Sequence, residues 1–153
     1  MATHAQILTA LVNAIKSIVP ANGYITTVNP ANVFTETNLI DQMVQTTPGA
    51  YPRIFAFSDG AMYDDLPSGR IHKKEKFTVL AIFAKDVTNL SDPSLVLQVT
   101  NFMEDFESMI HRQKQMGGSD YVKLDTCATD VGTQSPEAVC IFEIEILYKR
   151  QLP

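Results

Sequence analysis

The chain has 153 residues, of which 45% are hydrophobic and 19% are charged, and its formal net charge is −5 at neutral pH. This length and composition exclude a disordered chain, so we expect residues 1–153 to form a single domain with a sizeable core. The negative charge argues against nucleic-acid binding by phosphate neutralisation, which requires clustered lysines and arginines. Two cysteines are too few for a disulfide framework, and we expect Cys127 and Cys140 to be free, buried thiols on neighbouring strands. The N-terminus has no basic leader and no uninterrupted apolar run, which predicts neither a signal peptide nor a membrane span.

The N-terminal part of the chain predicts one amphipathic helix followed by short elements. Thr3 and Gln6 have the spacing of a capping box, and the apolar residues after them recur at helical spacing to about Val19. A proline and an Asn-Gly pair then end this helix. We expect Tyr24–Val28 to be an edge strand or an extended arm, and we expect a short helix to follow Thr37.

The middle of the chain predicts two paired strands separated by a loop. Lys74–Lys85 is a short apolar run rich in β-branched and aromatic residues, which is typical of a central strand covered on both faces. Arg53–Ser58 predicts a second strand that pairs with it. Asp59–Gly69, between them, is rich in turn-forming residues and too long for a tight turn, so we expect a projecting, mobile loop.

The C-terminal part predicts a long helix and a closing hairpin. Apolar residues keep helical spacing through Pro93–Met116, and Gly117-Gly118 is expected to cap the end of that helix. Tyr121–Val131 and Val139–Lys149 predict two strands, the second with one core face and one partly solvated face. The order of elements therefore predicts an α+β fold: an antiparallel β-sheet of about four main strands, with an N-terminal helix and a long central helix packed on one face.

No group of residues has the spacing of an active site or of a metal site. His4 and the other two histidines have no partner at metal-ligand spacing, so we expect ordinary surface side chains. Asp59, Asp64 and Asp65 lack the regular ligand spacing of an EF-hand and are expected to form a solvated acidic loop. No nucleotide-binding loop or catalytic motif is present, so we expect no enzyme activity and no cofactor.

Charged and apolar residues at the expected surface suggest contacts with other subunits. The basic residues Arg70, Lys73 and Lys74 directly follow the acidic loop, and this arrangement suits head-to-tail contacts between copies. The alternative is that these lysines only keep a strand soluble. Ile141 and Leu147 face outward on an otherwise acidic strand face, either as interface positions or as scattered surface apolar residues.

Several segments, taken in order, carry a resemblance to a known family. They are the helix Ile7–Val19, the segment Val28-Asn29-Pro30-Ala31-Asn32-Val33-Phe34, Tyr51-Pro52-Arg53-Ile54 before a strand, a flexible loop, the strand Phe77–Ala84, the long helix Pro93–Met116 and a hairpin ending in Glu143–Lys149. In order, length and texture they resemble the tail terminator (tail completion) proteins of long-tailed, lambda-like bacteriophages. The resemblance covers nearly the whole chain.

The resemblance implies a structural protein of the virion. Members of the family are small α+β subunits that close into a homo-hexameric ring, cap the finished tail tube, stop its polymerisation and offer a surface to head-completion or neck proteins. It implies assembly in the host cytoplasm and a final place in the neck region of the phage tail. DNA would pass through the lumen without specific binding, which the mildly acidic charge suits. It also assigns subunit contacts to the sheet edges, to Asp59–Gly69 and to Arg70–Lys76.

Two alternatives remain open. Another head–tail joining or tube-like neck protein would share this size and texture, and ring size and the partner bound would separate the two. A small ligand-binding or enzymatic α+β domain would instead need a concave pocket with converging polar groups between the long helix and the sheet.

Overall fold

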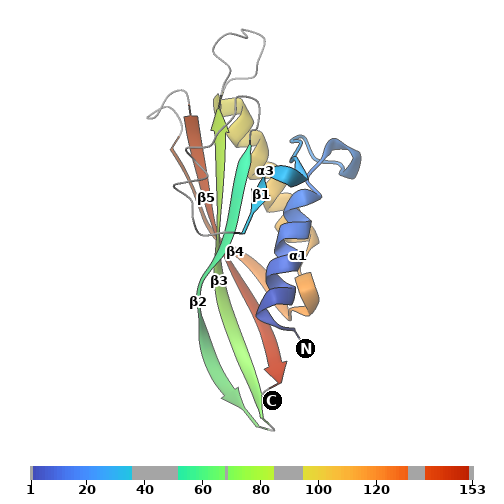
Figure 1. The fold of residues 1–153 in the computed structure, drawn as a ribbon, viewed down its shortest axis with the longest axis vertical. Helices are drawn as coiled ribbons and strands as arrows, with labels where there is room; N and C mark the ends of the chain where they lie inside the picture. Colours follow the sequence, from blue (N-terminus) through green and yellow to red (C-terminus); the bar gives the residue numbers. More distant parts are fainter. Residues whose placement is uncertain (1, 36–51, 68, 85–94, 131–136, 152–153) are drawn as a thin grey trace.

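The computed structural model describes residues 2–35, 52–67, 69–84, 95–130 and 137–151, which form an α+β fold. Its five-stranded sheet has the order β1-β2-β3-β5-β4, and helices α1 and α3 lie against one face of it (Figure 1). The strands are β1 (Val33–Phe34), β2 (Arg53–Leu66), β3 (Arg70–Ala84), β4 (Tyr121–Asp130) and β5 (Glu137–Gln151); the helices are α1 (His4–Lys16) and α3 (Leu95–Arg112). The expected fold class is confirmed, with β1 as a short additional strand that pairs parallel to β2.

β3 is the central strand of the sheet, as its apolar run predicts. It pairs antiparallel with β2 on one side and with β5 on the other. Phe77 and Phe83 point toward the helices and are buried, because strand side chains alternate between the two faces. On the opposite face Ile82 is buried but Leu80 is partly exposed, so the expected cover on both faces holds for only part of the strand.

Helix α1 begins as expected and ends early. The Thr3 hydroxyl accepts the Gln6 backbone N–H at 3.2 Å, and the Gln6 side chain accepts the Thr3 N–H at 2.8 Å, which confirms the capping box. The helix ends at Lys16 rather than near Val19. Val19 is extended, with φ −144° and ψ 153°, because the residue before a proline is disfavoured in the helical conformation.

Tyr24–Val28, expected to be an edge strand or an extended arm, does not form a strand. Side chains of α3, rather than a neighbouring strand, hold this segment. The Asp105 carboxylate accepts the backbone N–H groups of Ile25 and of the following residue, at 3.0 and 2.6 Å, and the Arg112 guanidinium lies 4.6 Å from the ring centre of Tyr24. The single-turn helices Pro20–Asn22 and Pro30–Asn32 flank the segment.

The prediction of a mobile loop at Asp59–Gly69 is wrong. β2 continues to Leu66, and β3 begins at Arg70, so the chain turns only between these two residues. A β-bulge between Ser58 and Gly60 takes up one extra residue, Asp59, and Gly60–Leu66 then pair regularly with β3. Gly60 has φ 120°, where a side chain would be strained.

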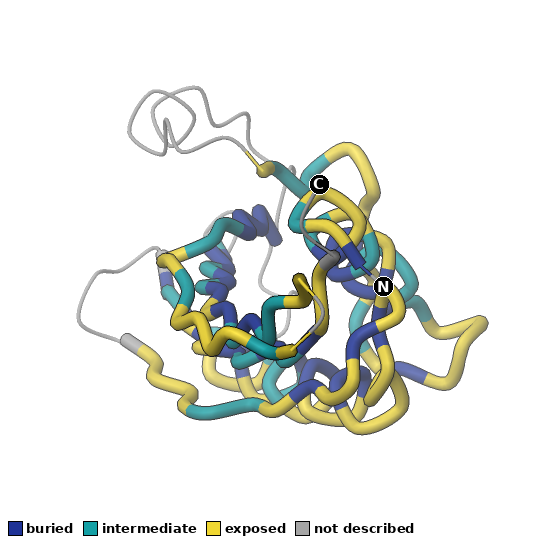
Figure 2. Tube along the Cα trace, turned by 90° about the horizontal axis from the view of Figure 1, so that it is seen from below, coloured by how far each residue is buried: buried dark blue, intermediate teal, exposed yellow. Residues whose placement is uncertain are grey.

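The lower parts of three strands form an arm that reaches beyond the ends of both helices (Figure 1). We define the arm as Gly60–Leu66 of β2, Arg70–Lys76 of β3 and Glu145–Gln151 of β5, which are paired in register. The N-terminus lies beside it, because the Ala2 N–H donates to the Lys149 carbonyl at 3.2 Å. Figure 2, which looks from below, shows buried stretches on the inside of the trace and exposed stretches around them.

Several other expectations change or lie outside the described residues. Cys140 is buried as expected but Cys127 is exposed, and their free thiol sulfurs lie 3.7 Å apart. Burial raises the pKa of both thiols above the usual value, which disfavours the reactive thiolate. The short helix expected after Thr37 and the helix start at Pro93 fall outside the described residues.

Gly117 marks a close contact between a turn and α1. Helix α3 ends at Arg112 rather than at Met116. The two glycines therefore do not cap the helix but belong to the separate 3-10 turn Met116–Gly118. Gly117 has φ +61°, and a Cβ atom there would lie 3.0 Å from the Ala10 Cβ and 3.1 Å from the Gln6 carbonyl oxygen. Gly118 also has a positive φ, +80°, but a Cβ atom there would meet nothing within 4 Å.

This difference predicts unequal effects of the same substitution. Gly118→Ala is expected to lower the free energy of unfolding by about 1 kcal/mol, through backbone strain alone. Gly117→Ala is expected to lower it by about 3 kcal/mol, because the methyl group also pushes α1 away from the turn. Chemical denaturation of the two variants measures this directly, and equal losses would contradict the packing described for Gly117.

Candidate functional site

A cluster of polar side chains lies where the arm joins the body, on the side of the sheet that faces the helices. Glu75 of β3 is at its centre and is only 1% exposed. One carboxylate oxygen accepts the Tyr148 hydroxyl at 2.5 Å and lies 3.3 Å from the Lys73 ammonium. The other accepts the Ser58 hydroxyl at 2.7 Å and lies 2.5 Å from Nδ1 of His4. The carboxylate therefore joins β2, β3, β5 and α1.

The partners of Glu75 keep it charged. Burial by itself would raise the pKa of this carboxyl, but the hydrogen bonds from Tyr148 and Ser58 and the charge of Lys73 outweigh burial and lower the pKa below its ordinary value. Burial, together with the hydrogen bond to the Glu75 carboxylate, raises the pKa of Tyr148. At neutral pH the cluster thus contains an ionised carboxylate and a protonated phenol.

The cluster is built to hold the arm rather than to react. Glu75 and Tyr148 expose at most 1% of their surface, so a substrate cannot reach them. Both carboxylate oxygens already have partners in the same chain, and the Lys73 ammonium also lies 5.4 Å from the ring centre of Tyr148. Buried charges with several hydrogen bonds fix relative positions strongly. The cluster therefore fixes the base of the arm relative to the body.

The structure gives two of these residues partners that the sequence did not indicate. His4 remains partly exposed but contacts Glu75, and Lys73, expected at an interface, is only 6% exposed and lies beside the same carboxylate. The strand alternation that buries Phe77 also places positions 75 and 73 on the inner face. That alternation was the available signal for the cluster.

The acidic residues expected at an interface lie on the edge strand β2. Asp59 sits in the bulge, and its carboxylate accepts the hydroxyl of Thr78. Asp64 and Asp65 are exposed toward the tip of the arm, where Asp64 is in register with His72. Their carboxylates are therefore on a formed strand and not on a loop.

The basic residues expected to contact another copy lie on the neighbouring strand of the same hairpin. Arg70 is exposed at the start of β3, in register with Leu66. Lys74 lies 3.7 Å from the Glu145 carboxylate of β5. Acidic and basic stretches thus neighbour each other within one chain, which reduces the net charge available for contacts between copies.

The two outward-facing apolar residues of β5 differ in exposure. Ile141 is 39% exposed on the face opposite the helices. Leu147 is partly buried in the arm, in register with Lys74 on one side and Tyr121 on the other. Of the two, Ile141 offers more apolar surface to a partner.

Both edges of the sheet are open over long stretches of the described structure. Only β1 pairs with the outer edge of β2, at Ile54 and Phe55, and no described strand pairs with the outer edge of β4. Unpaired backbone groups on such edges are a template for another strand. Large apolar side chains are exposed on both edges: Met62 (68%) and Tyr63 (60%) on β2, and Tyr121 (37%) on β4.

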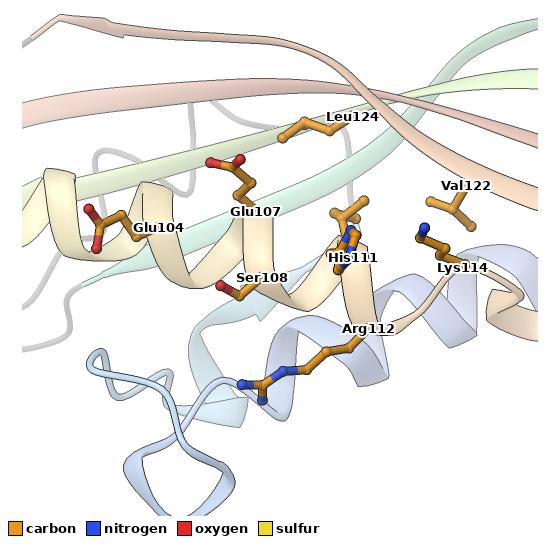
Figure 3. Close-up of a pocket in the computed structure, with 9 residues that line it drawn as sticks. Glu104, Glu107, Ser108, His111, Arg112, Lys114, Val122 and Leu124 are labelled. Carbon is orange, nitrogen blue, oxygen red and sulfur yellow. The ribbon is translucent and has the colours of Figure 1, made fainter.

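A groove of about 610 Å³ lies between α3 and β4 (Figure 3). Val122 and Leu124 of β4 provide its apolar side. Polar side chains line it along α3 and the turn that follows, with acidic residues at one end and basic residues at the other: Glu104, Glu107, His111, Arg112 and Lys114. They are spread along the groove and do not converge on one point, and Arg112 points away from Leu124, toward the segment it holds. This geometry suits an extended partner better than a small substrate.

The described residues contain neither a cluster of metal-ligating side chains nor a helix that could span a membrane. Within the described ranges, no three His, Cys, Asp or Glu side chains gather closely enough to hold a metal ion. Neither α1 nor α3, the helices that the structure describes, is long and apolar enough to cross a bilayer. The two sheet edges, with their exposed apolar side chains, and the groove between α3 and β4 are the candidate functional surfaces.

Removal of the Glu75 charge is expected to destabilise the protein in a pH-dependent way. Glu75→Gln leaves the Lys73 charge buried without its partner, which is expected to lower the free energy of unfolding at pH 7 by about 3 kcal/mol. Because folding lowers the pKa of Glu75, its contribution is complete above the ordinary value of about 4.3 and is lost as the pH falls through the lower folded value. The gap between wild type and variant should therefore narrow in strong acid.

Chemical denaturation at neutral and strongly acidic pH measures this gap. Glu143→Gln, an exposed change on the other face of β5, is the matched control and should have little effect. An unchanged penalty in acid would rule out ionised Glu75 as the source of the stabilisation.

The chain was compared with known proteins by sequence. No protein-family model matches it, and no curated protein is significantly similar to it.

Proposed function

We propose that this protein is an assembly subunit that closes into a ring and acts as the tail terminator of a long-tailed bacteriophage. The observation that carries the proposal is the arm, which presents Met62 and Tyr63 to solvent along a strand edge with which no described strand pairs. An open strand edge with two large, exposed apolar side chains is a template on which a strand of another chain can pair. The arm is therefore best understood as an interface.

The different character of the two edges supports a ring. The open edges belong to different strands, β2 and β4, so a contact between them joins unlike surfaces of two copies. Such head-to-tail contacts close into a ring when the rotation between copies closes. In the ring each edge is covered by a neighbour, so no strand edge is left for further growth. The homo-hexamer is the ring size that the family resemblance implies.

The closed ring would do the work of a terminator by occupying the end of the tail tube. The tube protein would dock on one face and a head-completion or neck protein on the other, in the neck of the virion. The net charge of −5 suits a lumen that DNA crosses without sticking, because an acidic wall repels phosphate.

A ligand-binding domain is the second candidate, and the groove between α3 and β4 is the observation that favours it. Its volume of about 610 Å³ is that of a small-molecule site. Its charged residues, however, follow the helix and do not surround one point. The groove therefore supports the assembly proposal as well, since a strand or side chain of another copy could fill it.

The ring is the first property to measure. Light scattering on the purified protein should give the mass of a hexamer, and negative-stain imaging should show a six-fold ring with a central hole. Added to growing tail tubes, the protein should stop elongation. A chain that stays monomeric at every concentration and leaves tube growth unchanged would overturn the proposal.

Reversal of charge on the arm should weaken assembly without unfolding the subunit. Arg70→Glu combined with Lys74→Glu places two new carboxylates beside Asp64, Asp65 and Glu145, so approach of another copy becomes unfavourable. We expect the dissociation constant of the ring to be about tenfold higher for this variant than for wild type. Lys16→Glu, at the end of α1, is the control. Unchanged assembly of a folded double variant would remove Arg70 and Lys74 from the interface.

A further inference from the structure

Met62 and Tyr121 lie in one row of the sheet although they belong to opposite edges. The register joins them directly: Met62 pairs with Lys74, Lys74 pairs with Leu147, and Leu147 pairs with Tyr121. Residues of one row lie at the same height along the strands. Identical copies set side by side, without a shift along the strands, therefore bring Met62 of one copy against Tyr121 of the next.

Strand direction fits the same arrangement. β2 and β5 run one way, and β3 and β4 run the other way. When two copies have the same orientation, β2 of one copy meets β4 of the next in antiparallel fashion. Copies in a cyclic ring must share their orientation relative to the axis. An antiparallel join of these two edges is thus the one that a ring permits.

The side chains next to that join are complementary. The neighbouring row ends in Ala61 on β2 and in Val122 on β4. In the join, Ala61 of one copy would therefore lie opposite Val122 of the next, and Tyr63, two residues after Ala61, would be a diagonal neighbour of that Val122. Tyr63 and Val122 both lie on the face of the sheet that the helices cover, and Val122 lines the groove beside Lys114. A diagonal neighbour is within reach of an aromatic ring.

Charge favours the same direction along the groove. Asp65 follows Tyr63 on the same face of β2, toward the tip of the arm. In the antiparallel join the tip points toward the Lys114 end of the groove and away from Glu104. A phenol ring beside an ammonium group and a carboxylate near the same lysine are both favourable contacts.

From these observations we infer that the groove between α3 and β4 of one copy receives Tyr63 of a second copy, while Met62 packs on Tyr121. This inference rests on the self-association in the proposed function and names the surfaces that make it. The Tyr63 ring fills the Val122 and Lys114 end of the groove. The edge of Gly60–Leu66 adds to β4 as a further antiparallel strand.

Cysteine cross-linking tests the pairing of Met62 with Tyr121. Directly opposite residues on paired strands have Cβ atoms roughly 5 Å apart, which is close to the spacing that a disulfide needs. Met62→Cys with Tyr121→Cys, in a Cys127→Ala background that removes the exposed native thiol, should give a ladder of covalent oligomers with oxidised glutathione. The glutathione disulfide accepts the two electrons and is released as two thiols. The pair Met62→Cys with Ile25→Cys, which joins the arm to an exposed position at the segment held by α3, should give no ladder.

Substitution of Tyr63 tests the groove itself. Tyr63→Ala should weaken self-association by about tenfold or more, the size typical of an aromatic anchor, and Tyr63→Phe should retain most of it. Val96→Ala removes a similarly exposed apolar side chain, 58% exposed on α3, and is the matched control that should change nothing. Dilution followed by mass measurement gives the dissociation constants.

The outcomes separate this inference from the proposed function. A ladder with the first cysteine pair, together with weaker association of Tyr63→Ala, supports the inference. If the wild type forms rings but the Met62→Cys/Tyr121→Cys variant gives no ladder, or if Tyr63→Ala associates as tightly as wild type, the inference is overturned and the ring remains a proposal. A wild-type chain that never associates overturns both.

Discussion

The carboxylate of Glu75 is the interaction on which the shape of the molecule depends. It accepts hydrogen bonds from Tyr148 of β5 and Ser58 of β2 and contacts His4 of α1, so one charge ties four elements together. A charge buried to this degree is tolerated only when all its partners are in place. The position of the arm relative to the helices is therefore well defined, because the displacement of any one partner would weaken the compensation of a buried charge.

The preformed strand of the arm lowers the entropic cost of the proposed interface. The exposed edge of β2 is already extended and in register with β3, so little conformational entropy would be lost when a neighbour adds a strand. A flexible loop with the same residues would lose far more on ordering. Formation of the strand changes Met62 and Tyr63 from residues of a solvated loop into side chains with fixed directions on opposite faces.

The groove and the arm are best considered together. Taken alone, the groove could be an ordinary hollow of the surface and the arm an ordinary long hairpin. The register places the exposed apolar residue of one edge in the same row as that of the other edge, which neither feature explains alone. Complementarity of the two edges is the property expected of a subunit that joins to copies of itself.

Sequence patterns determined the fold class, the capping box of α1, the long helix α3 and the central place of β3, because helical and strand periodicity act locally. They also placed Ile141 on the open face, since alternation along β5 is regular. The arm could not be predicted from Asp59–Gly69, where turn-forming residues suggested a loop. The bulge at Gly60 and the pairing with β3 outweighed local preference there.

The candidate interface was decided almost entirely by tertiary structure. The sequence identified the charged residues around the turn, yet it could not show that acidic and basic stretches neighbour each other in one hairpin, or that Lys73 is buried against Glu75. The rows that relate Met62 to Tyr121 depend on three strand registers, each set by contacts between residues far apart in the chain. Local sequence determines which residues can form a strand, but only the packing of the whole sheet decides which residues share a row.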